Sequence, residues 1–493
     1  MTRPVCFGAI LQIQNFITDA AKRASEMSGV SITKKQEQFL VLCLSSMLLC
    51  GHLMFTSVSL QCLGLFSVAA LSRMFRESKI PFDELIKAVV CILFEIYGPT
   101  KAFIVIDDTD RARCKVVKSL GFVFKTICKI TGGYILAQNV VFVCIVTDRF
   151  TIPIAFAFYF PDLAIKKWEK EIKALKKEKI HKKDHPKKPE RNPKFPTRIA
   201  MCKPLLVRAL AIINDIESHL LISKRPYIRL KIYATVADAA YMSPDLCEEI
   251  RQFFKFKVNF ISQLKSNQLC SIRNKNKSLE KYFSSQVKQT TEFEIRGKII
   301  KIEWASSRLQ IKSHGCRLHV ISLRYEGEKN WRYVAATDLT WRSEDIIKGY
   351  GLRWLVETFN EDWKQYGGWG KKAFQQGEEG CSRGVILSLL LDYFYLWHPL
   401  QVGLHRSAQP LCTVGSLVEH IQIEHIFTAI ETSLEQPDPK AHIKQIKDCV
   451  DKLFVLRSSR KHSAGGAGFA YPEIEISPSL LQRFGRENRR QSG

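Results

Sequence analysis

The sequence lacks the regular cysteine spacing of a zinc site or a disulfide framework. Fifteen cysteines are scattered over 493 residues, with no Cys-x-x-Cys pair and no cluster of cysteine and histidine at zinc spacing. Structural zinc is therefore not expected. The odd number of cysteines, their mostly apolar neighbours and the lack of a signal peptide indicate reduced thiols, as in a cytoplasmic protein.

The sequence also has no uninterrupted apolar run long enough to cross a membrane. Residues 39–50 and 53–71 are strongly apolar, but Gly51-His52, several serines and Gln61 keep each run below the about 18 to 20 residues that a span needs. We expect buried helices in both places and no membrane partner. A phosphate-cradling G-x-x-x-x-G-K-[ST] loop is absent as well, so nucleotide hydrolysis is not supported.

Acidic residues are few relative to basic ones. The chain has 48 Asp and Glu against 74 Lys and Arg, a net charge of +26 and a pI near 9.5, which favours a polyanionic partner, either nucleic acid or an anionic membrane surface. Residues 166–198 hold 14 Lys and Arg against 5 Asp and Glu, which is +9 of the +26 and leaves +17 for the rest of the chain. This stretch predicts an exposed helix at 166–180 and then a basic loop broken by prolines. A solubilising, mobile loop is an equally good interpretation.

One short segment places four polar side chains on a single helical face. At about 100° per residue, they fall within roughly 60° of one another: Tyr350, Arg353, Glu357 and Lys364. The opposite face is apolar and can dock on a core; it contains Leu352, Leu355, Val356, Phe359 and Trp363. A glutamate among cations on such a helix is most often part of a solvated ion-pair face. A functional interpretation therefore depends on acidic partners elsewhere in the chain.

Two predicted strands supply those acidic partners. A buried strand is predicted at 102–107, with the adjacent acids Asp107 and Asp108 at its end, and a second strand at 229–237 leads to Asp238. Each aspartate alone also fits a strand-end or turn role. Acids at the carboxyl ends of neighbouring strands converge on one crevice of an α/β sheet, where they repel one another unless hard cations such as Mg²⁺ or Mn²⁺ bind. Two such ions about 4 Å apart can activate a water or hydroxyl and stabilise the leaving oxygen of phosphoryl transfer.

These segments together resemble the DDE transposases of bacterial insertion sequences, in the insertion-sequence-four branch. The matching motifs are Asp108-Thr109, Ala237-Asp238-Ala-Ala-Tyr241 and the helical Y-x2-R-x3-E-x6-K at Tyr350, Arg353, Glu357 and Lys364. The intervals of 130 residues between the two aspartates and 119 residues from the second aspartate to the glutamate also match. The second interval exceeds what a simple RNase H-like fold needs, and relatives fill it with a β-rich insertion. The resemblance covers roughly residues 95–400.

The first acid of this triad is ambiguous. Asp107 and Asp108 are adjacent, so in a strand their side chains point to opposite faces and only one of them can enter the site. The D-T pairing of the family favours Asp108. Asp107 and Asp110 remain alternatives.

The resemblance implies a cut-and-paste DNA transposase. Asp108, Asp238 and Glu357 would be its catalytic residues and would hold two Mg²⁺ or Mn²⁺ ions. Its partners would be double-stranded DNA, namely the terminal inverted repeats of its element and the target, with a homodimer in the synaptic complex. Its expected location is the bacterial cytoplasm, in association with the nucleoid. The alternatives are a stand-alone RNase H-like nuclease and a catalytically inactive DNA-binding protein derived from a transposase.

The resemblance also implies specific DNA contacts. Tyr350, Arg353 and Lys364 would contact DNA near the cleaved end. Trp331 lies 26 residues before Glu357, in the region where relatives place an intercalating tryptophan. Packing in the small sheet of the insertion explains Trp331 equally well.

The expected fold class is α/β, with an RNase H-like catalytic core made of a mixed sheet and flanking helices. The core is expected at 96–262 and 340–400, and a β-rich insertion at 263–339 interrupts it. Its predicted order is β-β-β-α-β-α-β, with strands at 102–107, 134–147, 151–160, 229–237 and 256–262 and helices at 199–222 and 243–254. A helical DNA-end-binding domain at 1–95, with a weak helix-turn-helix pattern at 59–76, precedes the core. A helical region at 401–493, with a mobile tail from Ser458, follows it.

Overall fold

The computed structural model shows a mixed α/β fold. It describes residues 9–113, 119–128, 132–225, 227, 229–255, 257–273, 275–295, 298–369 and 376–453. Residues 1–436 form one compact unit and residues 437–493 form a second. The predicted boundaries at 95, 262, 340 and 400 all lie inside the first unit and remain predictions, and the tail from Ser458 lies outside the described residues.

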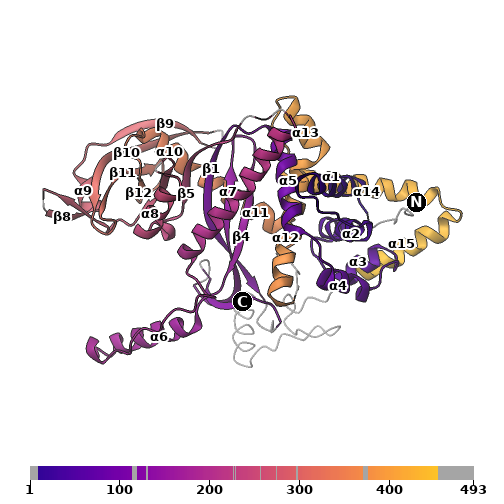
Figure 1. Cartoon of the computed structure of the whole chain (residues 1–493), viewed down its shortest axis with the longest axis horizontal. Helices are drawn as coiled ribbons and strands as arrows, with labels where there is room; N and C mark the ends of the chain where they lie inside the picture. The colour runs from indigo at the N-terminus through magenta and orange to yellow at the C-terminus, as the bar shows by residue number, and fades with distance from the viewer. Residues whose placement is uncertain are drawn as a thin grey trace, which may run out of the picture. The chain divides into compact units, whose positions relative to one another are not determined.

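The chain begins with the helices α1 to α5, continues with strands and interspersed helices, and returns to helices after β12 (Figure 1). The helices of the first unit are α1 (Leu11–Ser28), α2 (Lys34–Cys50), α3 (Phe55–Gln61), α4 (Val68–Glu77), α5 (Phe82–Tyr97), α6 (Leu163–Lys177), α7 (Arg198–Ile222), α8 (Pro244–Phe253), α9 (Leu279–Ser284), α10 (Ser343–Gly351), α11 (Arg353–Tyr366), α12 (Gly377–Trp397), α13 (Pro399–Arg406) and α14 (Val414–Leu434), with short 3₁₀ turns η1 (Lys182–Asp184) and η2 (Ala239–Tyr241). The strands are β1 (Lys101–Arg113), β2 (Phe124–Ile127), β3 (Tyr134–Val146), β4 (Thr151–Tyr159), β5 (Lys231–Ala237), β6 (Asn259–Leu264), β7 (Leu269–Ile272), β8 (Lys275–Ser278), β9 (Gln289–Ile295), β10 (Lys298–Ile311), β11 (Cys316–Tyr325) and β12 (Arg332–Ala336). The second unit contains α15 (Pro439–Leu453).

The N-terminal region is helical, as predicted. Thr33 begins α2 with a capping box, because its hydroxyl accepts a hydrogen bond from the Gln36 amide while its own amide donates to the Gln36 side chain. The apolar stretch 39–48 of α2 is buried in the main core, which explains why it is apolar on every side. A turn with Gly64 at φ +78° joins α3 to α4, so the predicted helix pair is confirmed, while its DNA binding remains a prediction.

The twelve strands that the structure describes join in one sheet. Their order is β2-β3-β1-β5-β6-β12-β11-β10-β7-β8, with β4 beside β3 and β9 beside β10. β1 pairs antiparallel with β3 and parallel with β5, and β5 pairs parallel with β6. The chain order β1, β3, β4, α7, β5, α8, β6 confirms the predicted β-β-β-α-β-α-β, and the short strand β2 was not predicted. Helix α7 packs on β3 and β4, and α11 packs on β1, β3 and β4.

Strand β1 is longer than predicted, and its length positions the site. The prediction ended the strand at Asp107, but antiparallel pairing with β3 continues as far as Arg113. Pairing with β5 stops earlier, at Ile106 opposite Ala237. The residues of β1 beyond Ile106 are therefore paired on one side only, which leaves an open edge next to the end of β5.

The β-rich insertion extends the main sheet instead of forming a separate one. β12 pairs with β6, and β11 and β10 follow in antiparallel order. Between these strands and α9 lies a small hydrophobic cluster of their own, which includes Phe283, Leu318 and Tyr333. In Figure 1 the insertion and the helices α1 to α5 lie on opposite sides of the region around β1.

The predicted helix with the four polar residues is two consecutive helices. α10 ends at Gly351 and α11 begins at Arg353. Two glycines near the junction weaken the helix, and Gly349 is also needed for space, since a Cβ there would lie 3.1 Å from the ring of Phe103 on β1. The predicted apolar face of α11 is confirmed, and its Trp363 is fully buried.

No single helix in the described ranges is long and apolar enough to cross a membrane. Two bent pairs reach that length and composition only when both helices are counted together: α2 with α3, bent by 96°, and α12 with α13, bent by 43°.

None of the described cysteines forms a disulfide.

Asp392 on α12 makes the stability of the fold depend on pH. Burial, with the charge of Asp362 adding to it, raises the pKa of Asp392 from 3.8 to about 8. Between these two values the folded chain holds a proton that the unfolded chain releases, so this group's contribution to stability falls as pH rises, by at most about 1.4 kcal/mol per pH unit.

We predict that Asp392→Asn, which is similar in shape and does not ionise, removes this dependence. The melting temperature of the variant minus that of the wild type should increase as the pH is raised from 5 to 8. Asp148→Asn, at an exposed turn, is the control and should show no such trend. A difference between Asp392→Asn and the wild type that is constant with pH would contradict the prediction.

Candidate active site

The register of β1 against β5 brings two aspartates side by side. Ile106 lies opposite Ala237 in the parallel pair, so the next residues, Asp107 and Asp238, follow at adjacent positions where β5 ends. Registered residues of parallel strands point to the same face of a sheet. The structure therefore places Asp107 and Asp238 on one face, at the carboxyl end of β5.

The two carboxylates are held in the same way. One oxygen of Asp107 accepts a hydrogen bond of 2.9 Å from the Asp108 amide, and one oxygen of Asp238 accepts a bond of 2.7 Å from the Ala239 amide. Asp107 is only 8% exposed. Burial raises the pKa of Asp107 to about 7, with Asp108 and Asp238 adding to the rise, although the nearby charge of Arg353 opposes it. A cation at this site would hold both acids ionised at neutral pH.

Arg353 at the start of α11 links this pair to Glu357. Its guanidinium bonds the Glu357 carboxylate at 2.5 Å and lies 3.9 Å from the second oxygen of Asp107. The Glu357 side chain is 42% exposed, whereas that of Arg353 is 18% exposed. Arg353 is therefore the counter-ion between Asp107 and Glu357.

Tyr350 closes the site from the end of α10. Its ring is buried and its hydroxyl donates a hydrogen bond of 3.0 Å to Gln263 on β6. Burial raises the pKa of Tyr350, and Asp238 raises it further, while Arg353 and Arg332 lower it. These influences place Tyr350 among Asp238, Arg353 and the beginning of β12.

Further cations lie beside the acids. Burial, together with the charge of Arg111, lowers the pKa of Lys364, and burial lowers the pKa of Arg113 to about 10. Arg111 and Arg113 alternate with Asp110 and Ala112 along β1, so they share the face of Asp107. The Arg113 guanidinium lies 4.8 Å from the centre of the Trp369 ring. The sequence analysis missed both arginines, although the run Asp-Arg-Ala-Arg in an extended strand would have indicated them.

Asp108 lies on the other face of β1. Tyr241 donates a hydrogen bond of 2.8 Å to one of its oxygens, Asn139 on β3 donates one of 2.7 Å to the other, and Arg198 at the start of α7 lies 3.6 Å away. Asp110 shares this face and also accepts a bond from Asn139. The geometry therefore favours Asp107, the alternative left open by the sequence, over Asp108 as the acid beside Asp238. The reason is the alternation of side chains along β1, which the motif alone does not resolve.

Trp331 lies directly before β12, on the insertion. Its ring packs against the small hydrophobic cluster, and two cations cover it: the Lys288 ammonium at 5.0 Å and the Arg324 guanidinium at 4.7 Å from the ring centre. The next residue, Arg332, is close enough to Tyr350 to lower the pKa of that phenol. Trp331 is thus near the site and partly packed, and its role in DNA binding remains a prediction.

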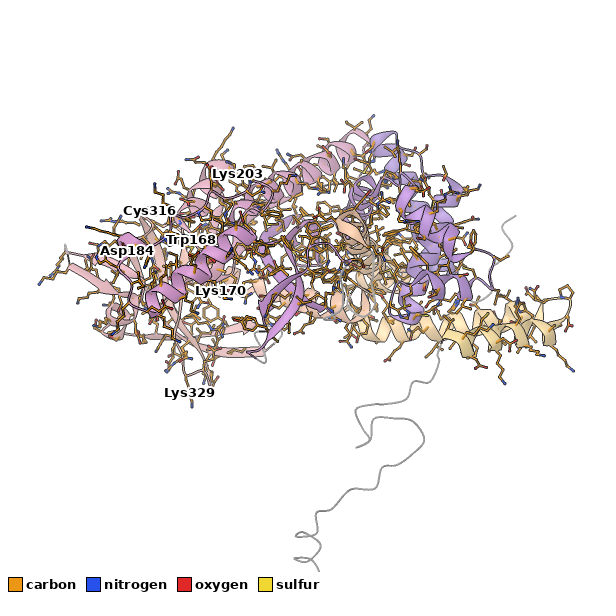
Figure 2. All side chains as sticks on the ribbon, turned by 90° about the horizontal axis from the view of Figure 1, so that it is seen from below. Trp168, Lys170, Asp184, Lys203, Cys316 and Lys329 are labelled. Atoms are coloured by element: carbon orange, nitrogen blue, oxygen red, sulfur yellow. The ribbon has the colours of Figure 1, made fainter. Side chains whose placement is uncertain are left out.

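The basic segment predicted at 166–198 is an exposed helix and an anchored loop. Figure 2 shows Trp168 and Lys170 on α6. The Trp168 indole donates a hydrogen bond of 2.8 Å to the Pro186 carbonyl, and the Asn192 amide donates one of 2.9 Å to Asp162. These bonds fold the loop back onto the beginning of α6 and leave its lysines exposed.

The carboxylates of Asp107, Asp238 and Glu357 are ligands that suit a hard divalent cation. In Asp107 and in Asp238, only one of the two carboxylate oxygens accepts a hydrogen bond from a backbone amide. Over the described part of the chain, no three His, Cys, Asp or Glu side chains converge at metal-binding distance. Glu357 is instead turned to Arg353. A metal site formed by all three acids therefore requires Glu357 to exchange this cation for another.

Comparisons with known proteins give a likeness in structure but none in sequence. No protein-family model matches the chain, and no curated protein matches its sequence. Among solved structures, the fold is similar to that of a piggyBac transposase in a synaptic complex with hairpin DNA. The two are 10% identical over 93% of this chain and 86% of that chain, with a TM-score of 0.39. A likeness at this level does not define a family for the chain.

Proposed function

We propose that this protein is a DDE-type DNA transposase whose three acids are Asp107, Asp238 and Glu357. The observation that carries the proposal is the pair Asp107 and Asp238, which directly follows the last registered residues of β1 and β5, with the glutamate of α11 joined to Asp107 through Arg353. An RNase H-like core made of β1, β3, β4, β5 and β6 is part of the proposal. The strand order β4-β3-β1-β5-β6, with parallel pairing from β1 to β6, supports it.

The chemistry proposed for this site is phosphoryl transfer on DNA. The three acids would hold Mg²⁺ or Mn²⁺, and such ions, when bound, activate a water or hydroxyl and stabilise the leaving oxygen. Arg353, Lys364 and Arg111 lie where cations can hold phosphates of the DNA end, and Tyr350 lies between Asp238 and Arg353. Hydrolysis of one phosphodiester frees a 3′-OH, which then attacks a strand of the target DNA.

DNA recognition in this proposal involves other parts of the chain. The net charge of +26 supports a polyanionic partner, and the α3–α4 helix pair is the proposed end-binding element. Two inverted repeats must be held together for cut-and-paste transposition, so a homodimer in the synaptic complex is proposed with them. The proposed location is the bacterial cytoplasm, in association with the nucleoid.

We expect Asp107→Asn, Asp238→Asn and Glu357→Gln each to reduce metal-dependent cleavage by about 1,000-fold or more while DNA-end binding survives, because each removes one ligand charge. The assay uses DNA that carries the ends of the element, taken from the flanks of the gene. Asp148→Asn, at an exposed turn, is the control and should cleave normally. Loss of cleavage in Asp108→Asn with normal cleavage in Asp107→Asn would reverse the assignment of the first acid.

The same assay separates the alternative functions. Cleavage followed by joining of the 3′ ends to target DNA identifies a transposase. Cleavage without joining identifies a stand-alone nuclease. DNA binding without either reaction identifies an inactive derivative of a transposase.

We predict that the exposed lysines of the α6 segment contribute to the salt dependence of DNA binding. The test variant replaces Lys173, Lys176, Lys177 and Lys183 by Gln. The slope of log affinity against log salt should become less steep by up to about 0.9 for each DNA phosphate that these lysines neutralise in the wild type. The matched control replaces Lys440, Lys444, Lys447 and Lys452 by Gln in α15. Equal slopes for the test variant and the wild type would mean that the segment is only solvated.

We predict that Trp331 stacks on a base displaced at the cleaved end. Stacking on an aromatic ring is worth about 1–3 kcal/mol per base and would hold a distorted end open. Trp331→Ala should leave first-strand nicking nearly normal and slow the next step, and 2-aminopurine at the DNA end should report an unstacked base. If the folded variant completes both steps at normal rates, Trp331 only packs between Lys288 and Arg324.

A further inference from the structure

A partly buried hydrogen bond crosses the end of the β1–β5 pair, directly behind the two site aspartates. The Tyr241 hydroxyl donates a bond of 2.8 Å to Asp108. Asp108 is the residue after Asp107, and Tyr241 follows Asp238 by three residues. The bond therefore joins the chain segments that carry the two acids, on the face of the sheet opposite to them.

Tyr241 is fixed at both ends. The 3₁₀ turn η2 brings its amide to within 2.9 Å of the Asp238 carbonyl, and that carbonyl also accepts a bond of 2.9 Å from the Ser262 hydroxyl of β6. The ring is 1% exposed, so it has no room to swing away. Burial and the charge of Asp108 raise the pKa of Tyr241 well above its ordinary value, so the phenol remains a donor at any physiological pH.

Asp108 is equally constrained. Its second oxygen accepts the bond from Asn139, which is fully buried, and faces Arg198 of α7. The guanidinium of Arg198 in turn lies 4.7 Å from the centre of the Tyr159 ring on β4. Both oxygens of Asp108 are thus used by side chains of β3, η2 and α7, and this carboxylate is held away from the face of Asp107 and Asp238.

We infer that Asp108 and Tyr241 are a positioning pair that fixes the separation of the Asp107 and Asp238 carboxylates for divalent-cation binding. This inference rests on the proposed function. Backbone pairing between β1 and β5 ends one residue before the two acids, so it does not hold them together by itself. The Tyr241–Asp108 bond supplies a cross-link beyond that point. A positioning residue of this kind acts on metal affinity and does not touch the reacting atoms.

The main test is Mn²⁺ binding to the full-length, DNA-free protein, followed by the EPR signal of free Mn²⁺. Tyr241→Phe removes one hydroxyl and keeps the ring, and should weaken Mn²⁺ binding about tenfold or more, within the 10–100-fold range usual for residues that orient metal ligands. Tyr233→Phe removes a hydroxyl from a tyrosine of the preceding strand β5 and should bind as the wild type. Melting temperatures of both variants establish that they fold.

Two substitutions of Asp108 separate positioning from ligation. Asp108→Asn can keep both contacts, because its amide oxygen can accept from Asn139 while its amide nitrogen donates to the Tyr241 hydroxyl, which can act as donor or acceptor. We therefore expect near-normal Mn²⁺ affinity in Asp108→Asn and a loss like that of Tyr241→Phe in Asp108→Ala. The double variant Tyr241→Phe with Asp108→Ala should be no weaker than either single variant, because both remove the same bond.

The outcomes distinguish this inference from the proposed function. If Asp107→Asn and Asp238→Asn lose Mn²⁺ binding while Tyr241→Phe binds normally, the positioning role is wrong and the proposed function stands. Loss of binding in Asp108→Asn as large as in Asp107→Asn makes Asp108 a ligand and also overturns the inference. No Mn²⁺ binding by the wild type, or normal binding in Asp107→Asn and Asp238→Asn, contradicts the proposed function itself.

Discussion

The register of β1 against β5 is the constraint on which the site depends. Side chains alternate along a strand, so a slip of one residue would replace Asp107 by Asp108 on the face of α11 and Glu357. Hydrophobic burial alone does not prevent such a slip, because Ile104, Val105 and Ile106 are buried on both faces of the strand. Specific contacts must fix the register, and the structure offers several of them around the acids.

Those contacts come from both faces of the sheet. On one face, the missing side chain of Gly349 lets α10 approach the ring of Phe103 closely. On the other face, Asn139 of β3 bonds both Asp108 and Asp110, and Tyr241 bonds Asp108. A register shifted by one residue would bury these acids without their donors, which costs about 1–3 kcal/mol for each unsatisfied group and more for a charge. Polar contacts thus fix the register of β1, which its buried apolar residues do not determine.

The electrostatics of the site follow from the same arrangement. The buried Asp107 and the half-buried Asp238 lie at adjacent positions and repel each other, and burial already raises the pKa of Asp107 to about 7. Arg353 offsets part of this cost by lying between Asp107 and Glu357. Lys364 and Arg113 are half-buried cations whose pKa values are lowered by burial. The site as a whole therefore favours an anion next to these cations and a cation between the acids. Phosphate groups and a divalent cation together meet both requirements.

The sequence predicted the order of the elements well because that order depends on local patterns. Apolar runs, strand alternation and helix faces predicted a helical N-terminal region, the strands β1, β3, β4, β5 and β6 and the buried face of α11, and these were confirmed. The break at Leu352 and the continuation of β1 past Asp107 depend on contacts with β3 and Phe103, which are distant in sequence. The same holds for the way the insertion extends the main sheet through β12 and β6.

The choice between the two adjacent acids shows where a motif stops being sufficient. A motif records residue types and spacing, and both Asp108-Thr109 and Ala237-Asp238-Ala-Ala-Tyr241 match by that measure. It does not record the face of the sheet to which each side chain points. In the structure each motif brings one residue to the face of the sheet opposite to α11. These residues are Asp108 from the first motif and Tyr241 from the second, and they form a hydrogen bond with each other. The acids that remain on the face of α11 are then Asp107 and Asp238, so the match to both motifs and the proposal of Asp107 as the first acid have the same structural cause.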